Sequence, residues 1–165
     1  MTSPALAWDS DAWRKLRNAK LLDWMAGNAN AVATVLALST IAETWDDLYD
    51  GDNPPDRARV NEAFTLALVE LQANDFYMAN MAIFYGLVVA TINAWMDSNA
   101  LAKSADRRDR MLAYHLRNFG HEITCVAAFR AGGWDHLRRV SLEIRAFFAN
   151  DDFDLWDANH GPDRT

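Results

Sequence analysis

Residues 76–101 read FYMANMAIFYGLVVATINAWMDSNAL and form the most apolar stretch of this 165-residue chain. The longest apolar run within it, MAIFYGLVVATI from Met81 to Ile92, is shorter than the roughly 20 residues needed to cross a bilayer. A helix that lacks a polar side has to be surrounded by other elements. We therefore expect residues 76–101 to form the central helix of an all-α protein, with no membrane involved.

Amphipathic segments lie on both sides of this stretch. Their apolar residues recur at spacings of three and four, which is the period of a helix with one buried face. We expect these helices at about 11–26, 32–48, 56–73, 105–131 and 134–149. The sequence therefore predicts an all-α, single-domain bundle of about six helices. Residues 1–149 would form the helical bundle domain and residues 150–165 an acidic C-terminal tail, in which Phe153, Leu155 and Trp156 suit a short segment that docks on the bundle.

The composition indicates a soluble globular protein. Hydrophobic residues make up 51% of the chain and charged residues 24%. The single cysteine, Cys125, has apolar neighbours, which indicates an inert buried thiol and a reducing compartment. The N-terminus lacks the basic-then-apolar order of a secretory signal. We expect a cytoplasmic protein.

The net charge of −7 argues against a broad electrostatic grip on nucleic acid. The charge is uneven, however, because residues 101–145 hold nine Lys or Arg against five Asp or Glu. This third of the chain suits either a local phosphate-facing surface or, as we prefer, a solvated helix face with ion pairs inside the chain.

A cluster of carboxylates lies in the segment IAETWDDLYDGD, residues 41–52. On a helix, Glu43, Asp46, Asp47 and Asp50 project at spacings of three and four, so hard oxygen ligands from adjacent turns could share Mg²⁺ or Mn²⁺. The spacing from Glu43 to Asp46 resembles one acidic motif of the all-α nucleotide pyrophosphohydrolases, although the second motif of that family is missing. The preferred interpretation is a solvated helix end, or one paired with arginines such as Arg57 and Arg59.

A second polar group lies on the predicted helix at 105–131. His115, Asn118 and Glu122 follow one stripe beside the apolar face, which suits a half-buried polar network or metal ligands. No pair of histidines has the spacing of three or four that a helical metal site uses. We therefore favour the polar network.

Large aromatics and arginines accumulate at the ends of the expected helices, where such residues are typical of protein interfaces. Arginines near a helix N-terminus oppose the helix dipole, so those at the start of the helix at 105–131 are expected to pair with an acidic partner. This partner is either the carboxylate cluster of residues 43–52, as we prefer, or another chain. The candidate interaction residues are Trp8, Arg107, Arg108, Trp134, Arg138, Arg139 and Trp156.

Three segments carry a resemblance to a known family. ETWDDLYDGD at 43–52, F..ALVEL..NDFY at 64–77 and GGWDHLRRVSLEIRAFF at 132–148 resemble a family of small, uncharacterised, all-helical proteins of tailed bacteriophages and prophages. Members of that family often have NPFY where this chain has NDFY at 74–77. The resemblance implies a phage origin, a helical fold and a place in the host cytoplasm or the virion. It implies no activity.

The function that we predict from these observations is that of a non-enzymatic interaction or structural protein. It would act through protein–protein surfaces, by binding a partner protein or by self-association, as a virion component or as an accessory of assembly or host interaction. It would need no cofactor. The alternative is a metal-dependent nucleotide or phosphoester hydrolase that uses the carboxylates of residues 43–50 with Mg²⁺ or Mn²⁺.

Overall fold

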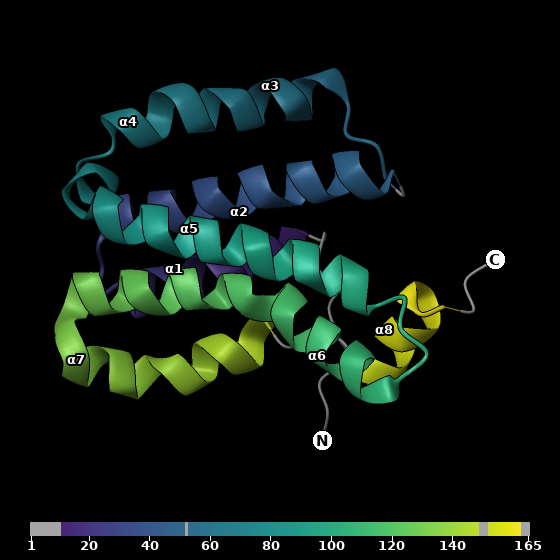
Figure 1. Ribbon diagram of the computed structural model, residues 1–165. Coiled ribbons are helices and arrows are strands. Elements are labelled where there is room, and N and C mark those ends of the chain that lie inside the picture. Colours follow the sequence, from purple (N-terminus) through teal and green to yellow (C-terminus); the bar gives the residue numbers. More distant parts are fainter. Residues whose placement is uncertain (1–10, 52, 149–151, 163–165) are drawn as a thin grey trace. The chain divides into compact units, whose positions relative to one another are not determined.

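The computed structural model describes residues 11–51, 53–148 and 152–162. Within these ranges all regular elements are helices, and no strand occurs (Figure 1). The elements are α1 Asp11–Trp24, α2 Ala29–Asp50, α3 Arg57–Thr65, a π-helical turn Leu66–Glu70, α4 Leu71–Ala73, α5 Asp75–Leu101, α6 Arg107–Arg117, a 3₁₀ turn Asn118–Gly120, α7 His121–Phe148 and α8 Phe153–His160. The predicted all-α class is confirmed.

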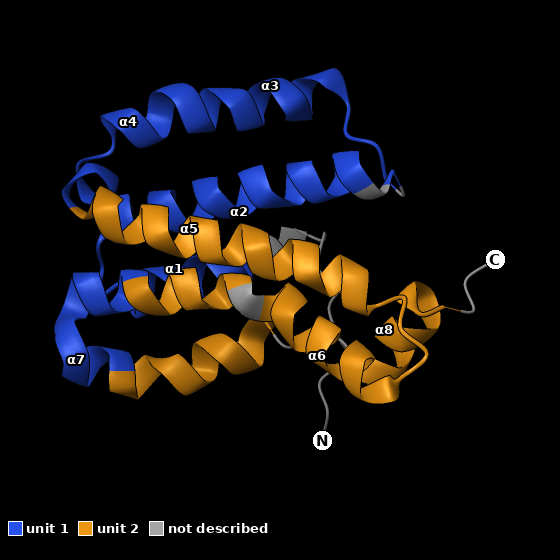
Figure 2. Ribbon diagram, in the orientation of Figure 1, with its two compact units in different colours: residues 1–79, 127–137 blue, residues 80–126, 138–165 orange. Residues whose placement is uncertain are grey.

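The chain divides into two compact units, coloured separately in Figure 2. Unit 1 comprises residues 1–79 and 127–137, and unit 2 comprises residues 80–126 and 138–165. The apolar helix α5 contributes residues to both units, as does α7. The prediction of a helical bundle that includes the apolar helix is confirmed. The predicted domain boundary at residue 149 stays a prediction.

In unit 1, α1 and α2 are joined by a tight turn. Gly27 has a φ of 79°, in the left-handed region that glycine adopts without steric cost. The Asn28 side chain then accepts a hydrogen bond from the N–H of Ala31 (3.0 Å) and caps α2. The Trp24 carbonyl at the end of α1 is hydrogen-bonded by Nε2 of His136 at 2.7 Å, so a residue of α7 satisfies one of the open carbonyls of this helix.

The start of α5 is fixed by Asn74. Its Oδ1 accepts a hydrogen bond from the N–H of Tyr77 (3.0 Å), which is the geometry of a helix N-cap. Its Nδ2 donates to the carbonyl of Asn30 in α2 (3.0 Å). The same side chain therefore starts the apolar helix and ties its beginning to α2.

The predicted helix at 105–131 is wrong as one continuous element. The structure has α6, a 3₁₀ turn at Asn118–Gly120 and then the first part of α7. The Asn118 side chain donates to the carbonyl of Tyr114 (3.0 Å), and Gly120 has a low helix propensity, so both residues favour a break here. The predicted end of this helix near residue 131 is correct, because Gly133 (φ 80°, ψ −174°) interrupts the helical backbone of α7.

In unit 2, α8 lies against α6 (Figure 1). Trp156 of α8 is 6% exposed and packs in an apolar cluster with Ala102 and Ala113. Two ion pairs hold the same two helices together: Arg107 with Asp154 and Arg110 with Asp157. The sequence predicted a docked segment in this tail, and α8 is that segment.

The conformation of Gly133 leads to a first prediction. Its φ and ψ lie in a region that is open almost only to glycine, so Gly133→Ala is expected to lower the free energy of unfolding by about 1–3 kcal/mol. Urea denaturation followed by circular dichroism measures the change. Gly120→Ala is the matched control, because Gly120 has no left-handed φ and an added Cβ meets nothing within 4 Å. Equal stability of the two variants would contradict the kink at Gly133.

Candidate functional site

One face of α5 is buried. Phe84 has no exposed surface, and Asn80, Ala94 and Ser98 are also buried. They recur at spacings of four and ten, so they lie on one side of the helix. This face of α5 is therefore part of the buried interior.

The opposite face of α5 carries a row of exposed apolar side chains. Tyr85 is 70% exposed, Met96 58% and Val89 49%. The row also includes Met81 and Ile92, and the spacings of four, four, three and four keep all five within about a quarter of the helix circumference. We call Met81, Tyr85, Val89, Ile92 and Met96 the α5 stripe.

The expectation that α5 is covered on every side is therefore wrong. Only 17% of the most apolar 18-residue window of α5 is buried. One face of the helix is buried, and the side chains of the stripe are exposed. By length and composition alone, α5 is also the one helix of the described residues that could cross a membrane.

Charges are scarce along α5. Its only carboxylates are Asp75 and Asp97, and it contains no Lys, Arg or His. Asp97 accepts a hydrogen bond from Nδ2 of Asn93 (3.0 Å), next to the C-terminal end of the stripe. The stripe is therefore an apolar surface with one polar, acidic end.

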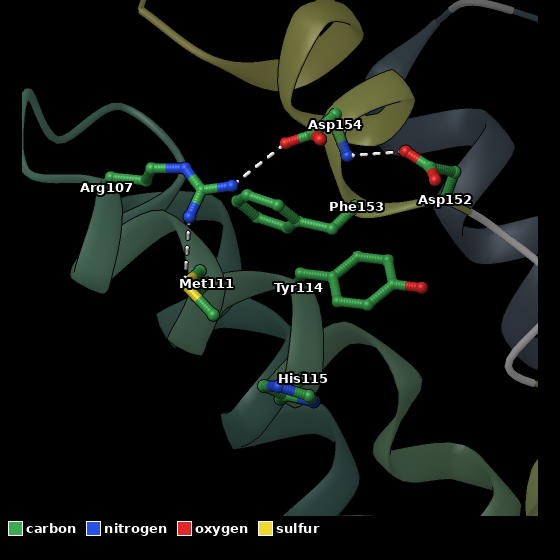
Figure 3. A pocket seen from close by; sticks show the side chains of 7 residues that line it. All are labelled: Arg107, Met111, Tyr114, His115, Asp152, Phe153 and Asp154. Carbon is green, nitrogen blue, oxygen red and sulfur yellow. Dashed lines mark hydrogen bonds and ion pairs between the residues drawn. The ribbon is translucent and has the colours of Figure 1, made fainter.

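A shallow pocket of about 310 Å³ lies in unit 2 between α6 and α8 (Figure 3). Its polar groups already bind one another: Nη2 of Arg107 is 3.0 Å from Oδ1 of Asp154, and the Arg107 guanidinium lies 5.0 Å from the centre of the Phe153 ring. Oδ1 of Asp152 accepts the N–H groups of Asp154 and Leu155 and caps α8. The described contacts give these residues a structural role in holding α8.

The predicted row of His115, Asn118 and Glu122 does not form a single site, because the 3₁₀ turn divides the helix that was expected to carry it. His115 lines the pocket of α6 and α8, and its ring contacts Tyr114 edge-on. Asn118 donates to a backbone carbonyl. Glu122 lies at the start of α7 and binds Arg145 near the other end of that helix.

The pair of Glu122 and Arg145 is bidentate, with distances of 2.7 and 2.8 Å. The hydrogen bonds from Arg145 lower the pKa of Glu122, and burial lowers the pKa of the neighbouring His121, whose Nε2 is 3.3 Å from Glu122. Burial also raises the pKa of Cys125 to about 11, so its thiol is protonated and inert at neutral pH. The pair joins the two arms of α7 on either side of Gly133.

The acidic end of α2 contains a paired carboxylate. Oε2 of Glu43 is 3.0 Å from Nη2 of Arg59, whose Nη1 also contacts Glu62 at 3.3 Å. Burial raises the pKa of Glu43, and the Arg59 charge opposes that shift. Asp46 and Asp47 are half-buried, and the side chain of Asp50 lies outside the described residues. Within the described part of the chain, no three acidic, His or Cys side chains are arranged to hold a metal ion.

The predicted interaction residues have different outcomes. Trp134 is 64% exposed, and Arg108, Arg138 and Arg139 are exposed as well. Trp156 is buried, so its assignment to a surface is wrong: its indole fills the space between α6 and α8. Arg107 pairs with Asp154 inside the chain rather than with residues 43–52. Trp8 lies outside the described residues.

Sequence reasoning did not find the α5 stripe. The sequence of α5 places apolar residues on every side of the helix, so the apolar period could not distinguish its buried face from its exposed one. Comparison with family models, curated proteins and solved structures finds no match for this chain. The resemblance to phage proteins therefore stays a prediction.

The buried Trp156 and the exposed Trp134 allow a matched test of the structure. Trp156→Ala is expected to cost about 3–5 kcal/mol of unfolding free energy, because it empties a buried site. Trp134→Ala changes an exposed side chain and is expected to stay within about 0.5 kcal/mol of the parent. Urea denaturation of both variants measures the difference, and similar costs would show that α8 does not dock on α6.

The pair of Glu122 and Arg145 predicts a pH dependence. The pKa of Glu122 is lower in the folded chain, so the stabilisation is complete above the pKa of an unfolded glutamate and is lost as pH falls through the folded value. At pH 7, Glu122→Gln should lower the free energy of unfolding by about 1 kcal/mol. This difference in unfolding free energy between Glu122→Gln and the parent should disappear in acid, where Glu122 is protonated and its ion pair with Arg145 is lost. Glu62→Gln is the control for a weaker exposed pair, and a cost for Glu122→Gln that does not depend on pH would contradict this account.

Proposed function

We propose that this protein is a non-enzymatic helical interaction protein that binds an apolar helix of another protein chain through the α5 stripe. The observation that carries the proposal is the exposure of Met81, Tyr85, Val89, Ile92 and Met96 on one face of a well-formed helix. Soluble proteins rarely leave a contiguous apolar surface of a few hundred Å² uncovered unless it binds something.

The chemistry of the stripe suits a helix as its ligand. Apolar anchors at spacings of three and four match the ridges of an amphipathic helix. Tyr85 offers a large exposed aromatic anchor, and Met81 and Met96 are flexible side chains that adapt to a partner surface. The lack of charge within the stripe is typical of the core of a protein interface.

A lipid surface fits the same face less well. Helices that lie on membranes carry Lys and Arg beside their apolar face, whereas α5 has neither and the chain carries a net charge of −7. A spanning helix would have to bring its covered face into the lipid as well. That face is buried, and the rest of unit 2 carries the charged side chains of Arg107, Arg110 and Arg145.

The ion pairs made by arginines of residues 101–145 favour a protein partner over nucleic acid. Arg107, Arg110 and Arg145 bind Asp154, Asp157 and Glu122, so three of the positive charges in this region are already neutralised inside the chain. Phosphate binding would have to compete with these pairs. At the acidic end of α2, the contact of Glu43 with Arg59 similarly favours an ion-paired helix end over a metal-dependent hydrolase.

The resemblance to phage proteins suggests the setting. A small helical protein that acts through an apolar surface suits a virion component or an accessory of assembly or host interaction. In each of these roles the work is done by binding, so the proposal requires no catalytic residues and no cofactor.

Photo-crosslinking in cells tests the proposed function. A benzophenone amino acid at position 85 is expected to form a covalent adduct with a protein, because this position is at the centre of the stripe and highly exposed. The same substitution at Leu142, which is 78% exposed on α7, is the matched control. Adducts of equal yield at both positions, lipid adducts alone at position 85, or no adduct there would contradict the proposal.

A further inference from the structure

We infer that the helix bound by the α5 stripe is α5 of a second copy of this chain, packed antiparallel across a two-fold axis near Val89. This inference rests on the proposed function and adds the identity of the partner. The stripe itself, the charges of α5 and the surroundings of Gly86 support it independently.

The stripe is close to self-complementary when its direction is reversed. With the axis near Val89, Met81 of one copy faces Met96 of the other, and Tyr85 faces Ile92. Each residue then meets an apolar residue, and the large Tyr85 ring lies opposite a branched aliphatic side chain. A two-fold interface requires such a surface, because the same patch is used by both subunits.

The charges of α5 favour the antiparallel arrangement. A parallel pair would place the two Asp97 carboxylates at the same level, beside two helix C-termini that already carry partial negative charge. In the antiparallel pair, Asp97 lies level with residue 80 of the other copy, so the two carboxylates are separated by about 25 Å along the axis. The helix dipoles are also opposed in direction, which favours this pairing.

Gly86 lies in the interior of α5, and no described contact within unit 2 requires a glycine at this position. Glycine costs about 1 kcal/mol relative to alanine in such a position. An added Cβ at Gly86 would meet nothing within 4 Å, so no other element of unit 2 uses the space. Ala82, one turn earlier, is also small and exposed. Both residues follow the stripe at the side of Tyr85 and Val89, and their small size would allow a second helix to approach closely.

The size of the stripe sets the expected strength of the dimer. Residues 81–96 span about 22 Å of helix, and a helix with its side chains is about 10 Å wide. The resulting contact covers about 220 Å² on each copy, which is smaller than a stable protein interface and typical of a weak one. We therefore expect a weak dimer with a dissociation constant on the order of tens of micromolar, in which half of the chains associate at that concentration.

Sedimentation equilibrium between about 1 and 200 µM protein tests the association. The parent chain should shift from a mass of 18.6 kDa towards twice that value as concentration rises. Val89→Asp should remain monomeric, whereas Leu142→Asp should dimerise like the parent, because Leu142 is an apolar residue off the stripe that is even more exposed than Val89. Circular dichroism checks that both variants keep their helices, and Tyr85→Ser is a second, milder variant for the stripe. A parent that stays monomeric, or a Val89→Asp variant that still dimerises, would overturn the inference.

Cross-linking tests the orientation. Met81→Cys and Met96→Cys chains should be joined by a short bismaleimide only when the two variants are mixed, because equivalent positions are about 22 Å apart in the antiparallel pair. Cys125 serves as an internal control, since its buried thiol is not expected to react and the parent should give no product. Efficient cross-linking of either variant with itself would instead show a parallel pair.

The adduct formed by the benzophenone at position 85 separates the two proposals. An adduct of twice 18.6 kDa identifies a second copy. A protein adduct of any other mass, together with a monomer in sedimentation, leaves the proposed function standing and overturns the identity of the partner. Absence of a protein adduct rejects both.

Discussion

A long apolar helix with two unlike environments is the constraint on which this structure depends. Between Asp75 and Asp97, α5 has no charged side chain, so the exposure of its apolar surface to water is unfavourable. One face of the helix avoids water, because Phe84, Ala94 and Ser98 are buried. The opposite face, the stripe centred on Tyr85 and Val89, stays exposed, and the function that we propose follows from this imbalance.

Polar contacts elsewhere in the molecule hold the helices that accompany α5. Asn74 starts α5 and binds α2, His136 binds the end of α1, and the pairs of Arg110 with Asp157 and Glu122 with Arg145 join segments that are far apart in sequence. Glu43 and Glu122, two of the carboxylates that the sequence singled out as candidate ligands, are engaged in ion pairs with Arg59 and Arg145.

The sequence was a good guide wherever a local signal was strong. The turn at Gly27, the helix end at Gly51 and the break at Gly133 all require backbone conformations that glycine adopts readily, so each was predictable. The 3₁₀ turn at Asn118–Gly120 was missed because the apolar period continues through it. The burial of Trp156 depends on Ala102 and Ala113, which are distant in sequence, and no local pattern reveals such a contact. For the same reason, an apolar period cannot show which side of α5 lacks a cover.

Hydrogen exchange of the α5 backbone amides at two protein concentrations, one below and one above the micromolar range, tests the central claim most directly. If the exposed side of α5 is covered by another chain, amides between residues 81 and 96 exchange more slowly at the higher concentration, while those of α1 and α8 do not change. Identical exchange of α5 at both concentrations would contradict the account, because the stripe would then face water at all times.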